Sequence, residues 1–257
     1  MSTTTTGRVG SLGRAELTLL WRNRTALVTA LLLPLGMVLA LRPSIDTLDL
    51  HGTGLSAAAL SVTGGTGFVL VFVVYYNLVT AYVARREELV LKRLRTGEAR
   101  DPEILAGTAL PAVAGALGQC AVLTVAGTLL LHLGPPRRPD LLLIGLTLGL
   151  VLSVALAAAS TVFTRSVELA QLTAAPLMLA STLGSGLILP LDVLPRPLPE
   201  LCRLLPMTPV MDLVRAGWTG GAGAGTARVL ESLGLALIWT VLAVLAAQRW
   251  FRWEPRR

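Results

Sequence analysis

Long runs without a charged residue constrain this chain more than any other feature. Four of them, 57–84, 104–131, 141–164 and 169–191, have 23 to 28 residues, and a helix needs about 20 to cross the apolar core of a bilayer. Two shorter runs, 25–41 and 232–248, are flanked by Arg, whose long side chain reaches the interface and lengthens the usable span. These runs predict an all-α membrane protein with six transmembrane helices.

The expected spans are about 25–41, 57–84, 104–133, 141–164, 169–191 and 229–249. Residues 1–10 are rich in Thr and Gly, which predicts a disordered tail, and residues 11–257 form a single membrane domain. In 11–24, Leu residues alternate with Arg and Thr beside Trp21, which indicates an N-terminal helix lying at the membrane interface. The alternative is a plain extension of the first span.

The distribution of basic residues predicts the orientation. Six spans place both termini on one side of the membrane, and 15 of the 22 Lys and Arg residues lie on that side, against 7 on the other. The positive-inside rule makes the richer side cytoplasmic. Both termini are therefore expected in the cytoplasm.

A charged island separates the second and third spans, at residues 85–103. Its residues 85–95 favour a helix, and Leu91 and Leu94 are spaced to share one face. Dense charge of both signs on a short cytoplasmic segment suits docking to a soluble partner, and an amphipathic helix lying on the membrane is the alternative. The residues expected to make this contact are Arg86, Glu87, Glu88, Leu91, Arg93, Leu94 and Arg95.

The segment 187–215 on the outer side combines prolines with leucines. Six prolines between 190 and 209 exclude one continuous helix, yet the leucines resist exposure to water. A re-entrant pair of short helices between spans five and six fits both properties, either as an outer gate or as a cap that only stabilises the fold. The candidate gate residues are Leu189, Pro190, Pro195, Leu201, Pro206 and Pro209.

Three polar side chains lie deep in the second span, namely Tyr75, Tyr76 and Asn77. They are candidates to line a pathway. The alternative, which is favoured for Asn77, is a hydrogen bond across a helix interface.

Chemistry that would power transport is missing from the chain. A phosphate-binding loop needs Gly-Lys followed by Ser or Thr, and the sole Lys, Lys92, follows Leu91. His51 and His132 lie in different outer loops without nearby Cys ligands, so no metal site is expected. The predicted spans also lack the mid-membrane carboxylate that an ion-coupled carrier usually keeps. The chain is therefore not expected to be an enzyme, and a partner must supply the energy.

The residues that carry a family resemblance are RREELVLKRLRTG followed by ILAG at 85–107, and SGLILPLDVLPRPLPELCRLLPMTPVMDLVRAGW at 185–218. With the six spans and the N-terminal helix, the chain resembles the type 2 ATP-binding-cassette (ABC-2) permeases, and is similar to the membrane subunits of daunorubicin-resistance exporters. Two positions depart from the pattern. That family often has Gly where Leu89 stands and Pro where Gly97 stands.

The resemblance implies a multi-pass permease of a bacterial plasma membrane that works in efflux and drug resistance. It implies a dimer of permeases, homomeric or heteromeric, with separate ATPase subunits that carry ATP and magnesium. The substrate class would be amphiphilic drugs, natural products or lipids moved outward. The alternatives are an ion-coupled secondary carrier and a membrane assembly factor, and no nucleic-acid partner is expected.

Topology gives the first testable prediction. Cys202 lies in the outer segment, whereas Cys120 lies within the third span. A membrane-impermeant maleimide added to intact cells should therefore label the chain, and Cys202→Ser should abolish the label. Labelling that occurs only in inside-out vesicles would reverse the predicted orientation.

Overall fold

The computed structural model is built from helices, and no strand occurs in the part of the chain that it describes. That part comprises residues 55–95, 100–188, 190–191, 195, 197–221, 225–251 and 253, together with 36, 38–40, 42–43 and 45.

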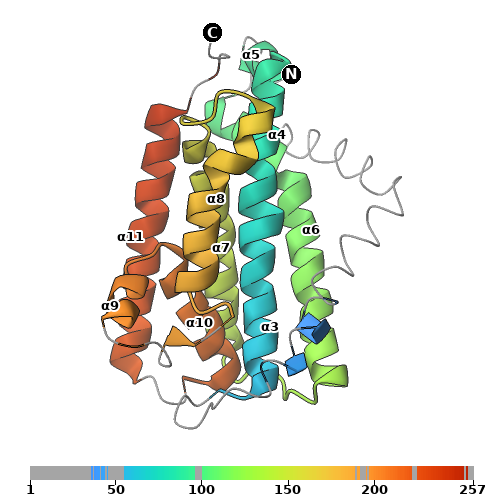
Figure 1. Cartoon of the computed structure of the whole chain (residues 1–257), viewed down its shortest axis with the longest axis vertical. Helices are drawn as coiled ribbons and strands as arrows, with labels where there is room; N and C mark the ends of the chain where they lie inside the picture. The colour runs from blue at the N-terminus through green and yellow to red at the C-terminus, as the bar shows by residue number, and fades with distance from the viewer. Residues whose placement is uncertain are drawn as a thin grey trace, which may run out of the picture.

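The helices pack as a bundle of roughly parallel rods (Figure 1). In chain order they are α3 (Ala57–Phe68), the π-helix η1 (Val69–Tyr76), α4 (Asn77–Glu87), α5 (Val90–Arg95), α6 (Asp101–Leu130), α7 (Pro139–Ser160), α8 (Val167–Gly184), α9 (Leu198–Arg203), α10 (Met207–Thr219) and α11 (Thr226–Trp250). Helices α3, η1 and α4 follow one another without a break and form one continuous rod.

Four helices in the described residues are long and apolar enough to cross a membrane, namely 57–87, 101–130, 139–160 and 226–250. They correspond to predicted spans two, three, four and six, with ends displaced by at most four residues. The all-α membrane class is therefore confirmed. The first predicted span, 25–41, lies almost entirely outside the described residues.

The predicted fifth span, 169–191, is too long. Helix α8 has 18 residues and ends at Gly184, and it is not among the four candidate spans. Its first two turns carry Glu168 and Gln171, two polar residues that lower its hydropathy. Beyond Gly184 the chain turns, with Gly186 at a φ of +70°, a backbone conformation that a residue with a side chain rarely adopts.

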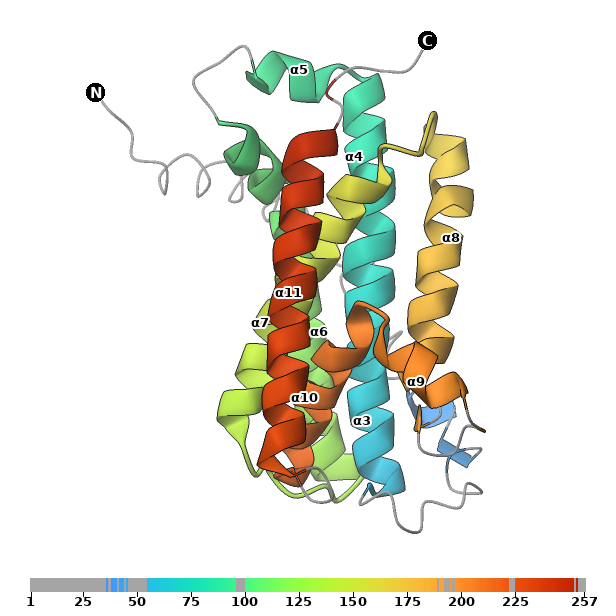
Figure 2. The same cartoon turned by 90° about the vertical axis from the view of Figure 1, so that its left-hand side faces the viewer.

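The two ends of the bundle carry different elements (Figure 2). The α5 end holds α5, the starts of α6 and α8, and the end of α11. The α9 end holds α9, α10, the start of α3 and the connection from α6 to α7. The described parts of the charged island and of the proline-rich segment therefore lie at opposite ends of the bundle.

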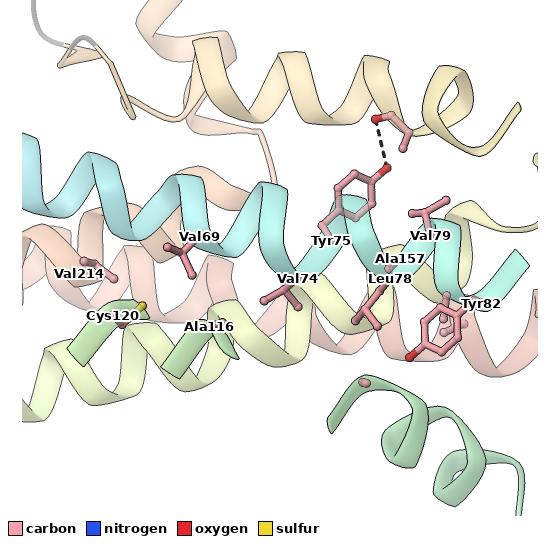
Figure 3. Close-up of a cluster of buried hydrophobic side chains, with 14 of the residues drawn as sticks. Val69, Val74, Tyr75, Leu78, Val79, Tyr82, Ala116, Cys120, Ala157 and Val214 are labelled. Atoms are coloured by element: carbon pink, nitrogen blue, oxygen red, sulfur yellow. Dashed lines mark hydrogen bonds between the residues drawn. The ribbon is translucent and has the colours of Figure 1, made fainter. Parts of the chain in front are cut away.

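The rod 57–87 is the centre of the bundle. Its most apolar stretch is 78% buried inside the protein, against 28% for α6 and 22% for α11. The two outer helices thus present most of their surface outward, where the apolar side chains suit lipid. Figure 3 shows part of the core, in which the rod contributes Val69, Val74, Tyr75, Leu78, Val79 and Tyr82 and the neighbours contribute Ala116, Cys120, Ala157 and Val214.

Glycines in α3 allow the segment after α8 to approach the rod closely. A Cβ atom built on Gly64 would collide with the backbone oxygen of Leu187, and one on Gly67 would lie 2.6 Å from the Leu187 side chain and 3.0 Å from Met211 Sδ. Leu187 is itself only 2% exposed. The Gly-rich face therefore packs against the turn that ends α8, as small residues do between membrane helices.

This packing predicts that Gly64→Ala destabilises the protein by about 1–3 kcal/mol, because the added methyl must displace backbone. Thermal unfolding in detergent should show a lower Tm. Gly234→Ala in α11 is the matched control, since nothing lies within 4 Å of its Cβ position. An equal change in both variants would contradict the close approach.

Candidate functional site

Arg86 is a fully buried cation near the end of α4, with 0% of its surface exposed. Its Nη1 donates to the Thr161 carbonyl oxygen at 3.0 Å and its Nη2 to the Thr164 carbonyl oxygen at 2.6 Å. Both carbonyls belong to the turn that follows α7. The last carbonyls of a helix have no partner within the helix and carry its negative dipole, so a guanidinium is a suitable cap.

Glu87, the next residue, contacts the start of the following helix. Its Oε1 accepts a hydrogen bond from the Val167 backbone N–H at 3.2 Å, and Val167 is the first residue of α8. A carboxylate suits this place because the amides at a helix N-terminus carry partial positive charge. Arg86 and Glu87 thus bind both ends of the α7–α8 turn, and we call the pair the α4 clamp.

The turn is further tied to α8 by threonine side chains. The hydroxyl groups of Thr164 and Thr173 lie 2.7 Å apart, and Thr161 donates to the Ala158 carbonyl oxygen at 2.7 Å. Thr161 and Thr164 are both buried. The end of α4, the turn and the first turns of α8 are therefore connected by side-chain hydrogen bonds as well as by apolar packing.

The chain turns sharply after the α4 clamp. Leu89 has a φ of +58° and is 41% exposed, so a large side chain occupies a left-handed backbone position that favours Gly. The backbone thus accounts for the Gly that the resembled family often has at this position. Gly97, the other departure, lies outside the described residues.

Helix α5 follows the turn, and one of its faces packs against the core of the bundle. Leu91 is fully buried and Leu94 packs against the same core cluster, while Glu88 and Arg93 are exposed. The predicted docking residues therefore divide into two groups. Glu87, Glu88 and Arg93 lie on the surface, whereas Arg86 and Leu91 face the interior; the side chain of Arg95 lies outside the described part.

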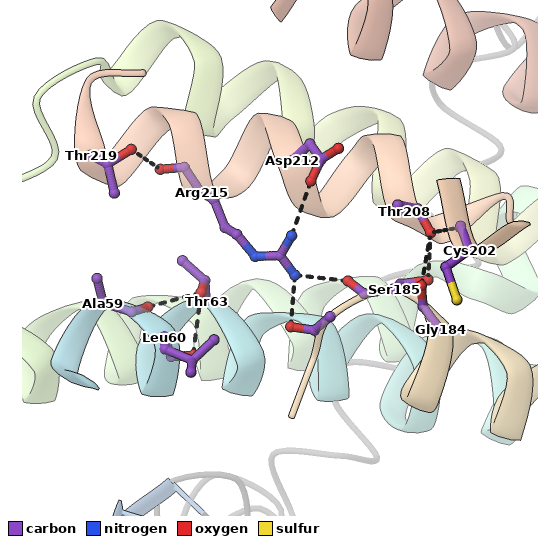
Figure 4. Close-up of polar contacts among 11 residues, drawn as sticks. Ala59, Leu60, Thr63, Gly184, Ser185, Cys202, Thr208, Asp212, Arg215 and Thr219 are labelled. Atoms are coloured by element: carbon purple, nitrogen blue, oxygen red, sulfur yellow. Dashed lines mark hydrogen bonds and ion pairs between the residues drawn. The ribbon is translucent and has the colours of Figure 1, made fainter. Parts of the chain in front are cut away.

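At the α9 end, a second arginine caps a second helix. Arg215 of α10 donates from Nη2 to the carbonyl oxygens of Ser185 and Gly186, both at 2.7 Å, directly after the end of α8. Its Nη1 lies 3.0 Å from Asp212 Oδ1, and the two side chains are only 11% and 26% exposed (Figure 4). Arg215 was not among the site residues predicted from the sequence. The pattern that could have indicated it is an acidic and a basic residue three positions apart within an apolar segment.

Thr208 of α10 connects the ends of α8 and α9. Its hydroxyl donates to the Cys202 carbonyl oxygen at 2.6 Å and lies 3.1 Å from Ser185 Oγ and 3.4 Å from the Gly184 carbonyl oxygen (Figure 4). Thr208 is 1% exposed. Together, Thr208 and Arg215 attach the end of α8 to α10, and we call them the α10 anchor.

The candidate gate residues are spread over this end of the bundle. Pro190, Pro206 and Pro209 are buried, whereas Pro195 is exposed and Leu201 is 60% exposed. Leu189 lies outside the described residues. Leu198 at the start of α9 and Leu204 just after its end are also exposed, at 45% and 63%, so α9 presents an apolar surface that the described part of the chain leaves uncovered.

The candidate pathway residues occupy different surroundings. The Tyr75 hydroxyl lies 3.2 Å from Ser160 Oγ and 3.4 Å from the Ala174 carbonyl oxygen, which places it between η1, α7 and α8. Tyr76 is half-buried beside Phe72, and Asn77 is exposed and donates to the Val73 carbonyl oxygen of its own rod. Tyr75 and Tyr76 are the last two residues of the π-helix η1. Short π-helical segments within α-helices are frequent at functional sites.

Comparison with protein families identifies the chain's family. The model of a family described as "ABC-2 type transporter" matches residues 8–218, which is more than half of the chain. The match includes the α4 clamp and the α10 anchor. No curated protein matches the chain.

The α4 clamp predicts a large effect of Arg86→Met, which keeps an apolar stem but removes the donor of the buried Thr164 carbonyl. The Thr161 carbonyl keeps the Thr164 backbone N–H at 3.2 Å. At about 1–3 kcal/mol for one unsatisfied buried group, stability should fall by roughly 1–3 kcal/mol. Thermal unfolding in detergent should show a Tm lower by several degrees.

Arg165→Met is the control, because Arg165 belongs to the same turn but is exposed. It should change stability by less than about 0.5 kcal/mol. Equal Tm values for the two variants would show that Arg86 does not hold the turn.

Proposed function

The chain belongs to the ABC-2 type transporter family, and on that premise we propose that it is the membrane-spanning permease subunit of an ATP-driven exporter. The observation that carries the proposal beyond the family match is the α4 clamp. It joins a charged segment outside the apolar spans to the helices within them, which is the connection that a subunit driven from outside its own chain requires.

A separate ATPase subunit supplies the energy in this proposal. The family is a transmembrane domain, and the chain has no Gly-Lys-Ser/Thr loop with which to cradle phosphates. ATP and magnesium would therefore bind the partner. The one Asp within the described α10, Asp212, is paired with Arg215, which argues against its use as the proton carrier of an ion-coupled transporter.

Docking would use the surface of the α5 end. Glu88 and Arg93 are exposed there with opposite charges, and buried Leu91 holds α5 against the core. A partner that displaces α5 and the end of α4 would displace the α7–α8 turn with them, because Arg86 and Glu87 bind that turn at both sides. Helix α8 would then carry the displacement to the α10 anchor at the other end.

The outer part of the proposal is a re-entrant pair made of α9 and α10. Helix α10 has 13 residues, or roughly 20 Å at 1.5 Å per residue, which is shorter than the apolar core of about 30 Å. Most of it is buried, and Gly217 lies so close to Leu142 of α7 that a Cβ would meet that backbone at 2.7 Å. This burial supplies the protein surroundings that a broken helix needs at membrane depth.

The complete assembly would contain two copies of the permease. The exposed leucines of α9 suit burial against a second protomer, where each fully buried side chain contributes roughly 1.5–3 kcal/mol. We place the amphiphile pathway between the two copies, in a bacterial plasma membrane with both termini cytoplasmic. Six spans and an N-terminal interfacial helix are part of the same proposal.

Docking can be tested separately from the clamp. The double variant Glu88→Lys with Arg93→Glu reverses two exposed charges without touching Arg86 or Glu87. Affinity-tagged chain purified from native membranes should carry an ATPase, identified by mass spectrometry, and the double variant should lose most of that protein and its ATP hydrolysis.

The control is Glu231→Lys with Arg203→Glu, which reverses two exposed charges at the α9 end. Both variants should insert normally, as judged by the membrane-bound yield. Undiminished recovery of the ATPase with the docking variant would refute the assigned surface. Absence of any ATPase from the wild-type preparation would count against the proposed function itself.

A further inference from the structure

We propose that a groove between α6, α7 and α11 binds an acyl chain of an anionic phospholipid, whose headgroup lies at the α5 end beside Arg100 and Arg249. The groove has a volume of about 830 Å³ and is lined by all three helices. A volume of this size is typical of ligand sites. None of the residues of the α4 clamp or the α10 anchor lines it, although Tyr82, one turn before Arg86, does.

The walls of the groove suit a hydrocarbon chain. Helix α7 contacts both α6 and α11 and contributes Leu150, Val151 and Val154 to the lining. The lining is apolar along almost its whole length, as shown by Leu110 and Val113 of α6, Val154 of α7 and Val244 of α11. Both flanking helices face mostly outward, so the groove opens toward the surrounding lipid.

Its end near α5 is different, because aromatic and polar groups gather there. Tyr82, Phe251 and Trp253 line this end as a chain of edge-to-face rings, with centroids 5.9 and 4.9 Å apart. The Tyr82 hydroxyl donates to the Leu105 carbonyl oxygen at 3.0 Å. Tyr and Trp are enriched where membrane spans meet headgroups, so these rings mark the depth at which an acyl chain would end.

The charge at the mouth favours an anionic headgroup. Arg100 directly precedes the lining residue Asp101, and Arg249 directly follows the lining residue Gln248. Both arginines are exposed. Two carboxylates lie at the same end, those of Asp101 and of Glu103, which accepts from the Arg100 backbone N–H at 3.0 Å. The Arg85 guanidinium, bonded to α6, adds a third positive charge, so these five groups carry a net charge of +1. Asp101 is the first residue of α6, where the helix amides already favour its carboxylate. Basic groups between membrane helices are a common site for acidic lipid headgroups.

The test uses the full chain in nanodiscs that contain phosphatidylglycerol or phosphatidylcholine with the same diazirine-bearing acyl chains. After irradiation, mass spectrometry locates the adducts. We expect adducts on the groove residues of α6, α7 and α11, and retention of phosphatidylglycerol when unlabelled phosphatidylcholine is added in excess. No adduct in the groove overturns the proposal, and equal retention of the two lipids overturns the headgroup assignment.

Two matched pairs of variants make the result specific. Ala106 is an exposed residue of α6 that lines the groove, so Ala106→Trp places a large side chain in it. Ala121 is an exposed residue of α6 that does not line the groove, so Ala121→Trp adds the same side chain elsewhere on the helix. Only the first should abolish the groove adducts. Arg249→Gln should lower the preference for phosphatidylglycerol by roughly fivefold, whereas Arg228→Gln at the other end of α11 should not.

A second copy of the chain in the groove would give a different result. If no adduct forms in the groove and Ala106→Trp alters the oligomeric mass of the purified protein, the groove is a contact between copies of the chain, and the lipid proposal fails. These readouts measure lipid retention, so they do not depend on the partner ATPase or on transport.

Discussion

Backbone carbonyls at the ends of membrane helices need hydrogen-bond donors, and in this protein two arginines supply them. Within a bilayer no water is at hand for an unpaired carbonyl, and each such group costs several kcal/mol. Arg86 donates to the carbonyls after α7, and Arg215 donates to those after α8. Side chains from α4 and α10 thus stabilise the turn after α7 and the end of α8.

Both arginines also connect parts of the chain that are distant in sequence. Arg86 lies 75 and 78 residues from its two acceptors, and Arg215 lies 29 and 30 residues from its own. One contact belongs to the proposed docking end and the other to the proposed outer gate, with α8 between them. A helix attached at both ends is a physical route by which a partner at one end can influence the other.

The sequence was sufficient for those features that depend on length and charge. Residues 57–84 have no charge over 28 positions, and the helix found there begins at the expected residue. The prolines near 195–209 correctly predicted separate short helices, found as α9 and α10. By contrast, α8 ends early because of Gly186 and the donors from Arg215, which lies 30 positions beyond Ser185. The hydrophobicity of the sequence does not indicate that Arg215 binds the carbonyls after α8.

The site was predicted less completely for the same reason. A charged residue in a charged island is usually exposed, so Arg86 was expected to face a partner, yet its acceptors are carbonyls, which any residue type provides. Leu91 and Leu94 were correctly placed on one face, but only the packing shows that this face is internal. Arg215 was missed because its partner carbonyls likewise leave no signature in the sequence.

The central claim, that the α4 clamp links the docking end to the outer segment, can be tested through the reactivity of Cys202. Cys202 is a partly exposed free thiol next to the α10 anchor, whereas Cys120 is buried. The maleimide labelling rate of Cys202 would be measured in the purified complex with ADP and with a non-hydrolysable ATP analogue. The account predicts that the rate depends on the nucleotide in the wild type and loses this dependence in an Arg86→Gln complex that retains its ATPase. The same nucleotide dependence in both complexes would contradict it.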